Sequence, residues 1–292
     1  MTVDFLVIGH ITHDRTPDGF RLGGTVSYAA VTARRLGRHP AILTRGASNG
    51  LLMTTAEPDS PANVAALPGS PLEGVSIHLL PSPVSTTFVN LYRDGQRTQV
   101  IEALAGPISP AELPPAWTQA PVVLLGPLVR EIPPAWVNVF PASLVGVTPQ
   151  GWMRQWDAAG HVRPARWENA AEFLHRADVV ILSREDAGGD EAYLATLAAQ
   201  ARLMVVTDGW RGAAVYCDGE RFHVPPRPTR EVDPTGAGDV FAAAFLIRLT
   251  ETRDPVIAAR FANVIASLSV EAPGMDAIPY REQVEAWLKS VA

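Results

Sequence analysis

Short runs of consecutive apolar residues, separated by stretches with helical spacing, most constrain the fold of this chain. The runs are continuous rather than alternating, which is typical of parallel strands covered by helices on both faces. They fall at residues 5–9, 41–44, 122–126, 144–147, 179–182 and 204–207. Helical spacing occurs at residues 26–36, 170–176, 190–201, 239–249, 256–268 and 281–291. This alternation predicts an α/β fold built from βαβ units.

The composition is that of a globular protein with a large core. The chain has 292 residues, of which 47% are hydrophobic and 18% are charged. Its net charge of −6 argues against a nucleic-acid partner, because a phosphate backbone requires a basic face. The single cysteine, Cys217, excludes an internal disulfide and a cysteine-based metal cage. The start of the chain is typical of a strand rather than a signal peptide, and no apolar run is long enough to span a membrane. We therefore expect a cytoplasmic protein without a membrane partner.

Two segments interrupt the βαβ pattern. Residues 84–102 are rich in β-branched and aromatic side chains, and Asp94-Gly95 predicts a hairpin turn between two strands. Residues 11–22 are polar and carry Asp18-Gly19. Between residues 107 and 149 the chain is rich in proline, which predicts rigid surface connections around two strands.

The segment Asp233-Pro234-Thr235-Gly236-Ala237-Gly238-Asp239 carries the strongest functional signal. Its glycines allow a sharp turn that points several N–H groups at one spot, and an apolar helix follows directly. The N-terminus of a helix favours an anion. A carboxylate at that place, Asp239, suits a base that deprotonates a hydroxyl beside a bound phosphoryl group. The structural alternative is an ordinary turn in which Asp239 is an N-cap or first-turn charge.

This heptad resembles the C-terminal signature of the ribokinase-like carbohydrate kinases of the phosphofructokinase B type. Pro234 replaces the usual threonine, and the other signature positions agree. The resemblance implies that Asp239 is the catalytic base. It also implies that Gly236, Ala237 and Gly238 form an anion hole for the transferred phosphate.

The N-terminal stretch resembles the first signature of the same family. By this resemblance Asp14, Gly23 and Gly24 bind the substrate, since a carboxylate can hold two hydroxyls and glycines let the backbone approach a ligand. Tyr28 stands where the family has an asparagine for sugar hydroxyls. A phenol cannot reproduce the paired donor and acceptor of an amide. Tyr28 therefore either hydrogen-bonds to or stacks on the substrate, or it faces the core. His10 and His13 flank this stretch, and a structural role is favoured over a catalytic one.

A possible metal position follows the strand at 179–182. The family commonly places Asn-x-x-Glu there, and its carboxylate holds Mg²⁺ through water. In this chain Ser183 and Asp186 take those two positions, and Glu185 is a substitute for the carboxylate. The alternative is a helix capping box, because Ser-x-x-acid is also that motif.

The nucleotide site implied by the resemblance is spread along the C-terminal half. Thr207 and Gly209 match a Thr-x-Gly-x-x-Gly segment that lies along the nucleotide, for which a plain strand-turn-strand is the structural alternative. Asn263 is either an adenine-pocket residue or a helix-packing residue. Some relatives bind K⁺ near the first signature aspartate, here Asp233, and the sequence leaves this ion open. The complete implied set for nucleotide binding is Thr207, Gly209, Thr235, Gly236, Gly238, Asn263 and Gly274.

Together these features predict a single ribokinase-like domain over residues 1–292. We expect a three-layer α/β/α sandwich with a mostly parallel sheet, and a small β lid from about 11–22 and 84–102. The expected activity is transfer of phosphate from ATP, with Mg²⁺, to a hydroxyl of a sugar, a cyclitol such as myo-inositol, or a nucleoside. The alternative is a catalytically weak regulatory relative that binds a ligand or nucleotide. A homodimer through the lid is the expected assembly.

Overall fold

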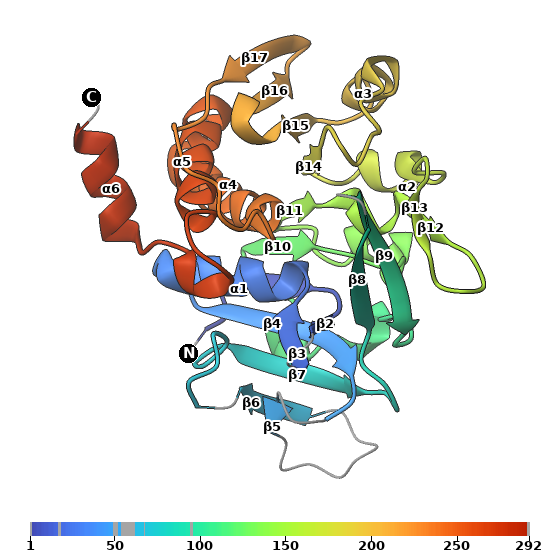
Figure 1. The fold of residues 1–292 in the computed structure, drawn as a ribbon. Coiled ribbons are helices and arrows are strands. Elements are labelled where there is room, and N and C mark those ends of the chain that lie inside the picture. The colour runs from blue at the N-terminus through green and yellow to red at the C-terminus, as the bar shows by residue number, and fades with distance from the viewer. Residues whose placement is uncertain are drawn as a thin grey trace.

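The computed structural model describes residues 2–16, 19–48, 52–53, 62–66, 68–93 and 96–290. These residues build an 11-stranded sheet, in which all neighbours from β15 to β7 run parallel (Figure 1). Antiparallel strands extend it at both edges. From edge to edge the strands are β17 (Glu220–Val224), β16 (Ala213–Cys217), β15 (Leu203–Thr207), β14 (Val179–Ser183), β11 (Leu144–Val147), β10 (Val122–Leu125), β1 (Phe5–Ile8), β4 (Pro40–Gly46), β7 (Ser76–Pro81), β6 (Ala62–Ala66) and β5 (Leu52–Met53).

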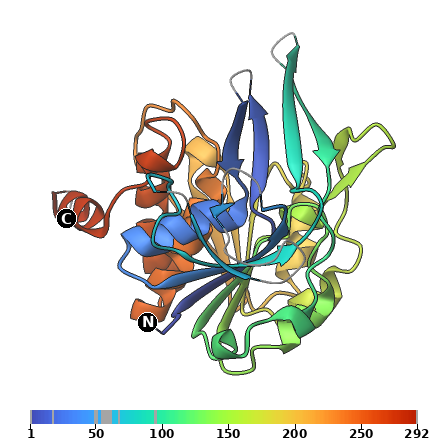
Figure 2. The same ribbon diagram turned by 90° about the horizontal axis from the view of Figure 1, so that it is seen from below.

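The two faces of the sheet carry different cover. One hydrophobic cluster combines the sheet with α1 (Thr25–Arg35), α4 (Ala237–Thr252), α5 (Pro255–Ser269) and α6 (Arg281–Ser290). The other combines it with α2 (Ala170–Leu174), α3 (Glu191–Ala198) and short 3₁₀ turns. The predicted α/β/α layering is therefore present (Figures 1 and 2). Over the described residues the 3₁₀ turns are Pro110–Glu112, Pro115–Trp117, Pro134–Asn138, Pro149–Gly151, Gly209–Arg211 and Met275–Ala277; Met275 of the last turn belongs to the first cluster.

The proline-rich segment contributes to the core, so the prediction of surface connections was wrong for it. Trp136 and Ile108 are both 0% exposed, and the Trp136 indole N–H donates to the Ile108 carbonyl at 2.8 Å. Prolines start several of its 3₁₀ turns, because a fixed φ suits the first helical position. These turns replace long helices on that face of the sheet.

A second, four-stranded sheet stands beside the main one. In order it contains β3 (Gly19–Gly23), β2 (Thr12–Thr16), β8 (Thr87–Arg93) and β9 (Gln96–Ala103), and we call it the small sheet. Its strands project away from the main sheet (Figure 2). It arises from the two segments that interrupt the βαβ pattern; the predicted turn at Asp94-Gly95 lies outside the described residues.

A short hairpin, β12 (Arg154–Trp156) and β13 (Val162–Pro164), was not predicted from the sequence. It joins the small sheet through a bridge between Val100 and His161. The fold thereby brings the segments after β1, β11, β14 and β15 to one edge, because the carboxyl ends of parallel strands lie together. In the part of the chain that the structure describes, no helix combines the length and apolarity that a membrane crossing needs.

Candidate active site

The segment 233–239 is a tight turn that leads into α4. Gly236 is the N-cap residue with φ 76°, a left-handed conformation that favours glycine. The Asp233 carboxylate holds the turn together: Oδ1 accepts from the Thr235 N–H at 3.0 Å, and Oδ2 accepts from the Gly274 N–H at 3.2 Å. Asp233 thus ties the turn to the loop after α5.

The predicted anion hole lies at the beginning of α4. The N–H of Ala237 donates to the Pro234 carbonyl at 3.1 Å, so this member of the predicted trio is engaged within the turn. The first N–H groups of a helix have no intrahelical partner and carry partial positive charge. Gly236 and Gly238 are therefore the two predicted members that best suit an anion here.

Asp239 occupies the first turn of α4 in an environment that disfavours its charge. Burial raises the pKa of this carboxyl to about 6, and the negative charge of Asp186 acts in the same direction. A hydrogen bond from Thr25 and the positive charge of Arg154 lower the pKa and oppose that rise. A carboxyl that titrates near 6 is a stronger base than an ordinary aspartate and is still ionised at neutral pH.

Tyr28 packs directly under the turn. A Cβ atom on Gly236 would come within 2.2 Å of the Tyr28 ring, so only glycine allows this contact. Burial raises the pKa of the Tyr28 phenol well above its usual range. Three carboxylates act in the same direction, those of Asp233, Asp239 and Asp14. The phenol therefore remains a hydrogen-bond donor in the midst of these acids.

Asp14 and the glycine pair meet where the small sheet joins α1. A Cβ on Gly23 would come within 2.7 Å of Asp14 Oδ2, and one on Gly24 within 2.4 Å of the His10 carbonyl oxygen. Gly24, with φ 90°, is the N-cap of α1. Close contact is thus the immediate reason for both glycines: Gly23 lies against the side chains of Asp14 and Thr12, and Gly24 lies against the backbone of residue 10. Arg21 of the same sheet lies 3.9 Å from Asp233 and so reaches the turn.

Asp186 forms the capping-box contacts that were the structural alternative for this position. Its Oδ2 accepts from the Ser183 N–H at 2.9 Å and the Ser183 hydroxyl at 2.7 Å. Its Oδ1 accepts from the Gln150 amide at 3.3 Å. The same carboxylate acts electrostatically on Asp239, which places it near the predicted phosphoryl site. Glu185 is exposed.

The Thr207 segment forms the strand-turn-strand that was the structural alternative for it. Thr207 ends β15 and pairs with Ala213, and the Asp208 N–H donates to the Gly212 carbonyl at 2.8 Å. Gly209 takes φ 51° in this turn. Arg184 Nε donates to Asp208 at 2.9 Å, which ties the turn to the segment that carries Asp186.

Asn263 and Gly274 lie on α5 and in the loop that follows it. Asn263 is buried, and its amide donates to the carbonyls of Val224 and Pro225 at 3.1 Å each. These bonds correspond to the packing alternative for Asn263. Gly274 has φ 69° and donates its N–H to Asp233, so it lies beside the turn.

Three residues near the acids are absent from the sequence-based prediction: Thr25, Gln150 and Arg154. Thr25 bonds Asp239, Gln150 bonds Asp186, and Arg154 acts on Asp239 by its charge. The signal for Thr25 was its place directly after the glycine pair. The other two follow β11 at the carboxyl edge of the sheet, where polar side chains gather.

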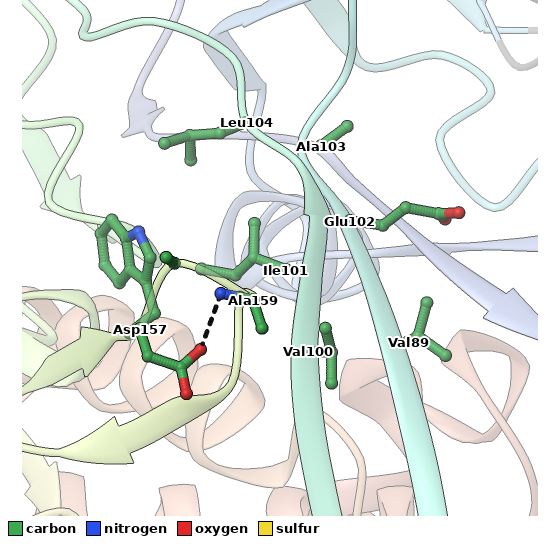
Figure 3. A pocket seen from close by; sticks show the side chains of 11 residues that line it. Val89, Val100, Ile101, Glu102, Ala103, Leu104, Asp157 and Ala159 are labelled. Atoms are coloured by element: carbon green, nitrogen blue, oxygen red, sulfur yellow. Dashed lines mark hydrogen bonds between the residues drawn. The ribbon is translucent and has the colours of Figure 1, made fainter.

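A hollow of about 670 Å³ lies beside the small sheet, between β9 and the turn after β12 (Figure 3). The turn is shaped by the Asp157 carboxylate, which accepts from the Ala159 N–H at 3.0 Å. None of the predicted site residues lines this hollow, which is formed by Val89, Val100, Ile101, Glu102, Ala103, Leu104, Trp156, Asp157, Ala158, Ala159 and Gly160.

No three His, Cys, Asp or Glu side chains come together as a metal-binding group within the described ranges. Asp186, which lies outside the turn, is close enough for its charge to raise the pKa of Asp239. A single carboxylate of this kind suits a Mg²⁺ ion that is held mainly by phosphate oxygens and water.

Comparisons with known proteins point to a family of carbohydrate kinases. Residues 162–281 match the pfkB family of carbohydrate kinases. The chain is 41% identical to the ribokinase of Bacillus subtilis over 83 residues, which are 28% of this chain and 28% of that enzyme. It is 27% identical to the fructokinase of Klebsiella pneumoniae over 96% of this chain and 97% of that enzyme.

Solved structures show the same fold. A pyrophosphate-dependent kinase of the ribokinase family, complexed with a pyrophosphate analog and myo-inositol, superposes with a TM-score of 0.77 at 22% identity, covering 97% of this chain and 99% of its own. Arabidopsis thaliana ribokinase, complexed with ribose and ATP, gives 0.71 at 20% identity, with 99% of each chain covered. The chain thus matches the pfkB carbohydrate kinases in sequence over residues 162–281 and has the ribokinase fold.

Proposed function

We propose that this protein transfers the γ-phosphate of ATP to a hydroxyl of a small sugar-like acceptor: a sugar, a cyclitol such as myo-inositol, or a nucleoside. The observation that carries the proposal is the environment of Asp239. A carboxyl with a pKa of about 6 stands in the first turn of a helix whose N-terminus suits an anion. The names of the similar proteins, ribokinase and fructokinase among them, support a kinase of this class.

The acceptor lies, in this proposal, between the small sheet and the N-termini of α1 and α4. Asp14 accepts hydrogen bonds from acceptor hydroxyls, the backbone at Gly23 and Gly24 lines the site, and the Tyr28 phenol donates to the acceptor. Tyr28 suits this role because its phenol stays protonated near neutral pH. The small sheet then serves as the lid over the acceptor.

Asp239 takes the proton from the acceptor hydroxyl while the hydroxyl oxygen forms a bond to the γ-phosphorus. The bond from that phosphorus to the bridging oxygen breaks, and ADP leaves with the electron pair. The N–H groups of Gly236 and Gly238 stabilise the transferring group, with Ala237 holding the shape of the turn. Arg154 supplies positive charge from the β12 side.

The nucleotide, in this proposal, lies along the turn at Thr207 and Gly209. Thr235 contacts its phosphates. Asn263 of α5 and Gly274 of the following loop lie near the base. Mg²⁺, when bound with ATP, would neutralise phosphate charge, and Asp186 is the residue that would hold it through water, with the exposed Glu185 as its substitute. Each Asp233 oxygen accepts one backbone N–H group, so we assign Asp233 the role of holding the turn; the K⁺ and Na⁺ buffers below test for an ion beside it.

The deciding experiment compares Asp239→Asn with the wild type. We expect turnover to fall by about 10²–10⁴-fold, because the base is lost, with little change in the ATP dissociation constant. Asp254→Asn is the matched control: Asp254 caps α5 away from the site, and asparagine caps equally well. ADP release is measured over a panel of sugars, inositols and nucleosides, with ATP and with pyrophosphate as donor, in K⁺ and in Na⁺ buffers.

Unchanged turnover in Asp239→Asn would remove Asp239 from the mechanism. Binding of ATP without turnover on any acceptor would instead favour the regulatory relative.

For the assembly we propose a homodimer through the small sheet, where Phe20 is 52% exposed and Leu104 just beyond β9 is 42% exposed. Light scattering measures the mass.

A further inference from the structure

His10 is a buried histidine at the carboxyl end of β1 that the proposed mechanism does not use. It is 0% exposed, yet both ring nitrogens have partners. Nε2 lies 2.9 Å from the Gly106 carbonyl oxygen, and Nδ1 lies 2.8 Å from the Thr86 hydroxyl. A carbonyl oxygen only accepts, so Nε2 carries the hydrogen and Nδ1 accepts from Thr86. The neutral ring therefore has one defined tautomer.

The surroundings of His10 hold it in this state. Burial lowers the pKa of its imidazole, and the charge of Arg45 acts in the same direction; the Glu131 charge and the Gly106 hydrogen bond oppose them. The Glu131 carboxylate lies 4.0 Å from Nδ1 and is occupied by backbone donors. It accepts from the N–H groups of His10, Leu128 and Val129 at distances between 2.8 and 3.2 Å. Glu131 thus fixes the backbone around the ring.

The two partners of the ring belong to the two connections between the β8–β9 hairpin and the rest of the molecule. Thr86 directly precedes β8, and Gly106 follows β9. The Thr86 hydroxyl also accepts from the Ala105 N–H at 3.1 Å, which joins one connection to the other. One imidazole at the end of a core strand therefore holds the chain where it enters and where it leaves the β8–β9 hairpin.

The same contacts reach Asp14. The His13 N–H donates to the Thr86 carbonyl at 3.0 Å, and in the β2–β8 pairing Asp14 lies opposite Phe88. The position of Asp14 relative to α1 and α4 therefore depends on where Thr86 places the start of β8.

We propose that His10, as its Nε2–H tautomer, is a positioning residue that holds both connections of the β8–β9 hairpin and thereby holds Asp14 at the acceptor. The acceptor part rests on the proposed function. The structural part, restraint of the two connections, stands on the contacts alone.

Two matched pairs of variants test the proposal. His10→Leu removes both ring contacts, whereas His10→Gln keeps an amide donor and acceptor. Thr86→Val removes the bridging hydroxyl at nearly constant shape, whereas Thr86→Ser keeps it. We expect His10→Leu and Thr86→Val to raise the acceptor KM about tenfold, the effect of one unsatisfied buried group, while kcat and the ATP dissociation constant change less than about twofold. His10→Gln and Thr86→Ser should recover most of the loss.

A second readout needs no substrate. Amide hydrogen exchange should quicken at residues 86–90 and 98–106 in His10→Leu and Thr86→Val, and stay unchanged in β10 and β11. His78→Leu, which removes a partly buried histidine from β7, should leave these amides and the acceptor KM as they are. Exchange that is unchanged, or faster by the same factor throughout the sheet, would overturn the positioning role. If the wild type phosphorylates no acceptor but the local exchange pattern holds, the proposed function fails while the restraint of the connections stands.

Discussion

At the scale of single residues, the site is a balance of charges around one carboxyl. Burial alone would make Asp239 a poor anion; Thr25 and Arg154 offset part of that cost, and Asp186 adds to it. The resulting pKa of about 6 keeps Asp239 ionised at neutral pH and still able to hold a proton in transit. The Tyr28 phenol feels the charges of both Asp239 and Asp14, so it lies between the turn and the small sheet.

This balance predicts opposite pH responses for two variants. Since the proposed base, Asp239, must be ionised to accept a proton, kcat/KM of the wild type should fall below pH about 6. Arg154→Met removes a charge that lowers the pKa of Asp239, so the acidic limb should move to higher pH. Asp186→Asn removes a charge that raises it, so the limb should move to lower pH. The pH profiles of the two variants and of the Asp254→Asn control check this, and shifts in the same direction would contradict it.

At the scale of elements, the place of α4 depends on close contact with β11. Gly146 lies in this strand, and a Cβ there would come within 2.6 Å of a Leu246 methyl group on α4. Leu246 is 0% exposed, so its side chain has little room to move. The strand–helix spacing in turn holds the beginning of α4, where Gly236 and Asp239 lie. In the sequence Gly146 is simply one member of an apolar run.

Gly146→Ala should therefore destabilise the fold by about 1–3 kcal/mol, the usual cost of overpacking a core. Leu246→Ala in the same chain makes room for the new methyl group, so the double variant should be less destabilised than the sum of the two single variants. Denaturant unfolding of the wild type, the two single variants and the double variant gives the coupling free energy between positions 146 and 246. Strict additivity would show that the contact does not limit the spacing. Gly238→Ala is the steric control for the alanine itself, since a Cβ at Gly238 meets nothing within 4 Å.

At the scale of the whole molecule, one sheet joins the two hydrophobic clusters. In β1, Phe5 and Val7 belong to one cluster, while Leu6 and Ile8 belong to the other. A strand buried on both faces must be apolar at every position, which is why its sequence is a continuous run. Loss of either cluster exposes the same strands.

The protein should consequently unfold in a single thermal transition, and ATP with Mg²⁺ should raise its midpoint. At a ligand concentration 100 times the dissociation constant, the stabilisation is about 2.7 kcal/mol. Asp239→Asn should retain this shift, because the proposed role of Asp239 is in proton transfer and not in ATP binding. Differential scanning calorimetry checks both points; two separate transitions would show that the clusters unfold independently.

Much of the architecture could be predicted from the chain alone. The continuous runs located six of the parallel strands, and helical spacing located α1 to α6, because each of these signals is local. The alternating Ser76–Pro81 strand and the β12–β13 hairpin were missed, since neither is a continuous apolar run. The proline-rich segment was predicted to lie on the surface, but Trp136 is buried because the neighbouring strands cover it, and no local pattern shows this.

The sequence by itself determined the βαβ order, the family resemblance and the turn that presents Asp239, since these depend on neighbouring residues and their backbone preferences. The tertiary structure alone decided that Tyr28 packs under Gly236, that Arg154 and Asp186 act oppositely on Asp239, and that His10 holds both ends of the β8–β9 hairpin. These contacts join residues far apart in the chain. Their distances follow from strand order and helix packing, which no local pattern of residues encodes.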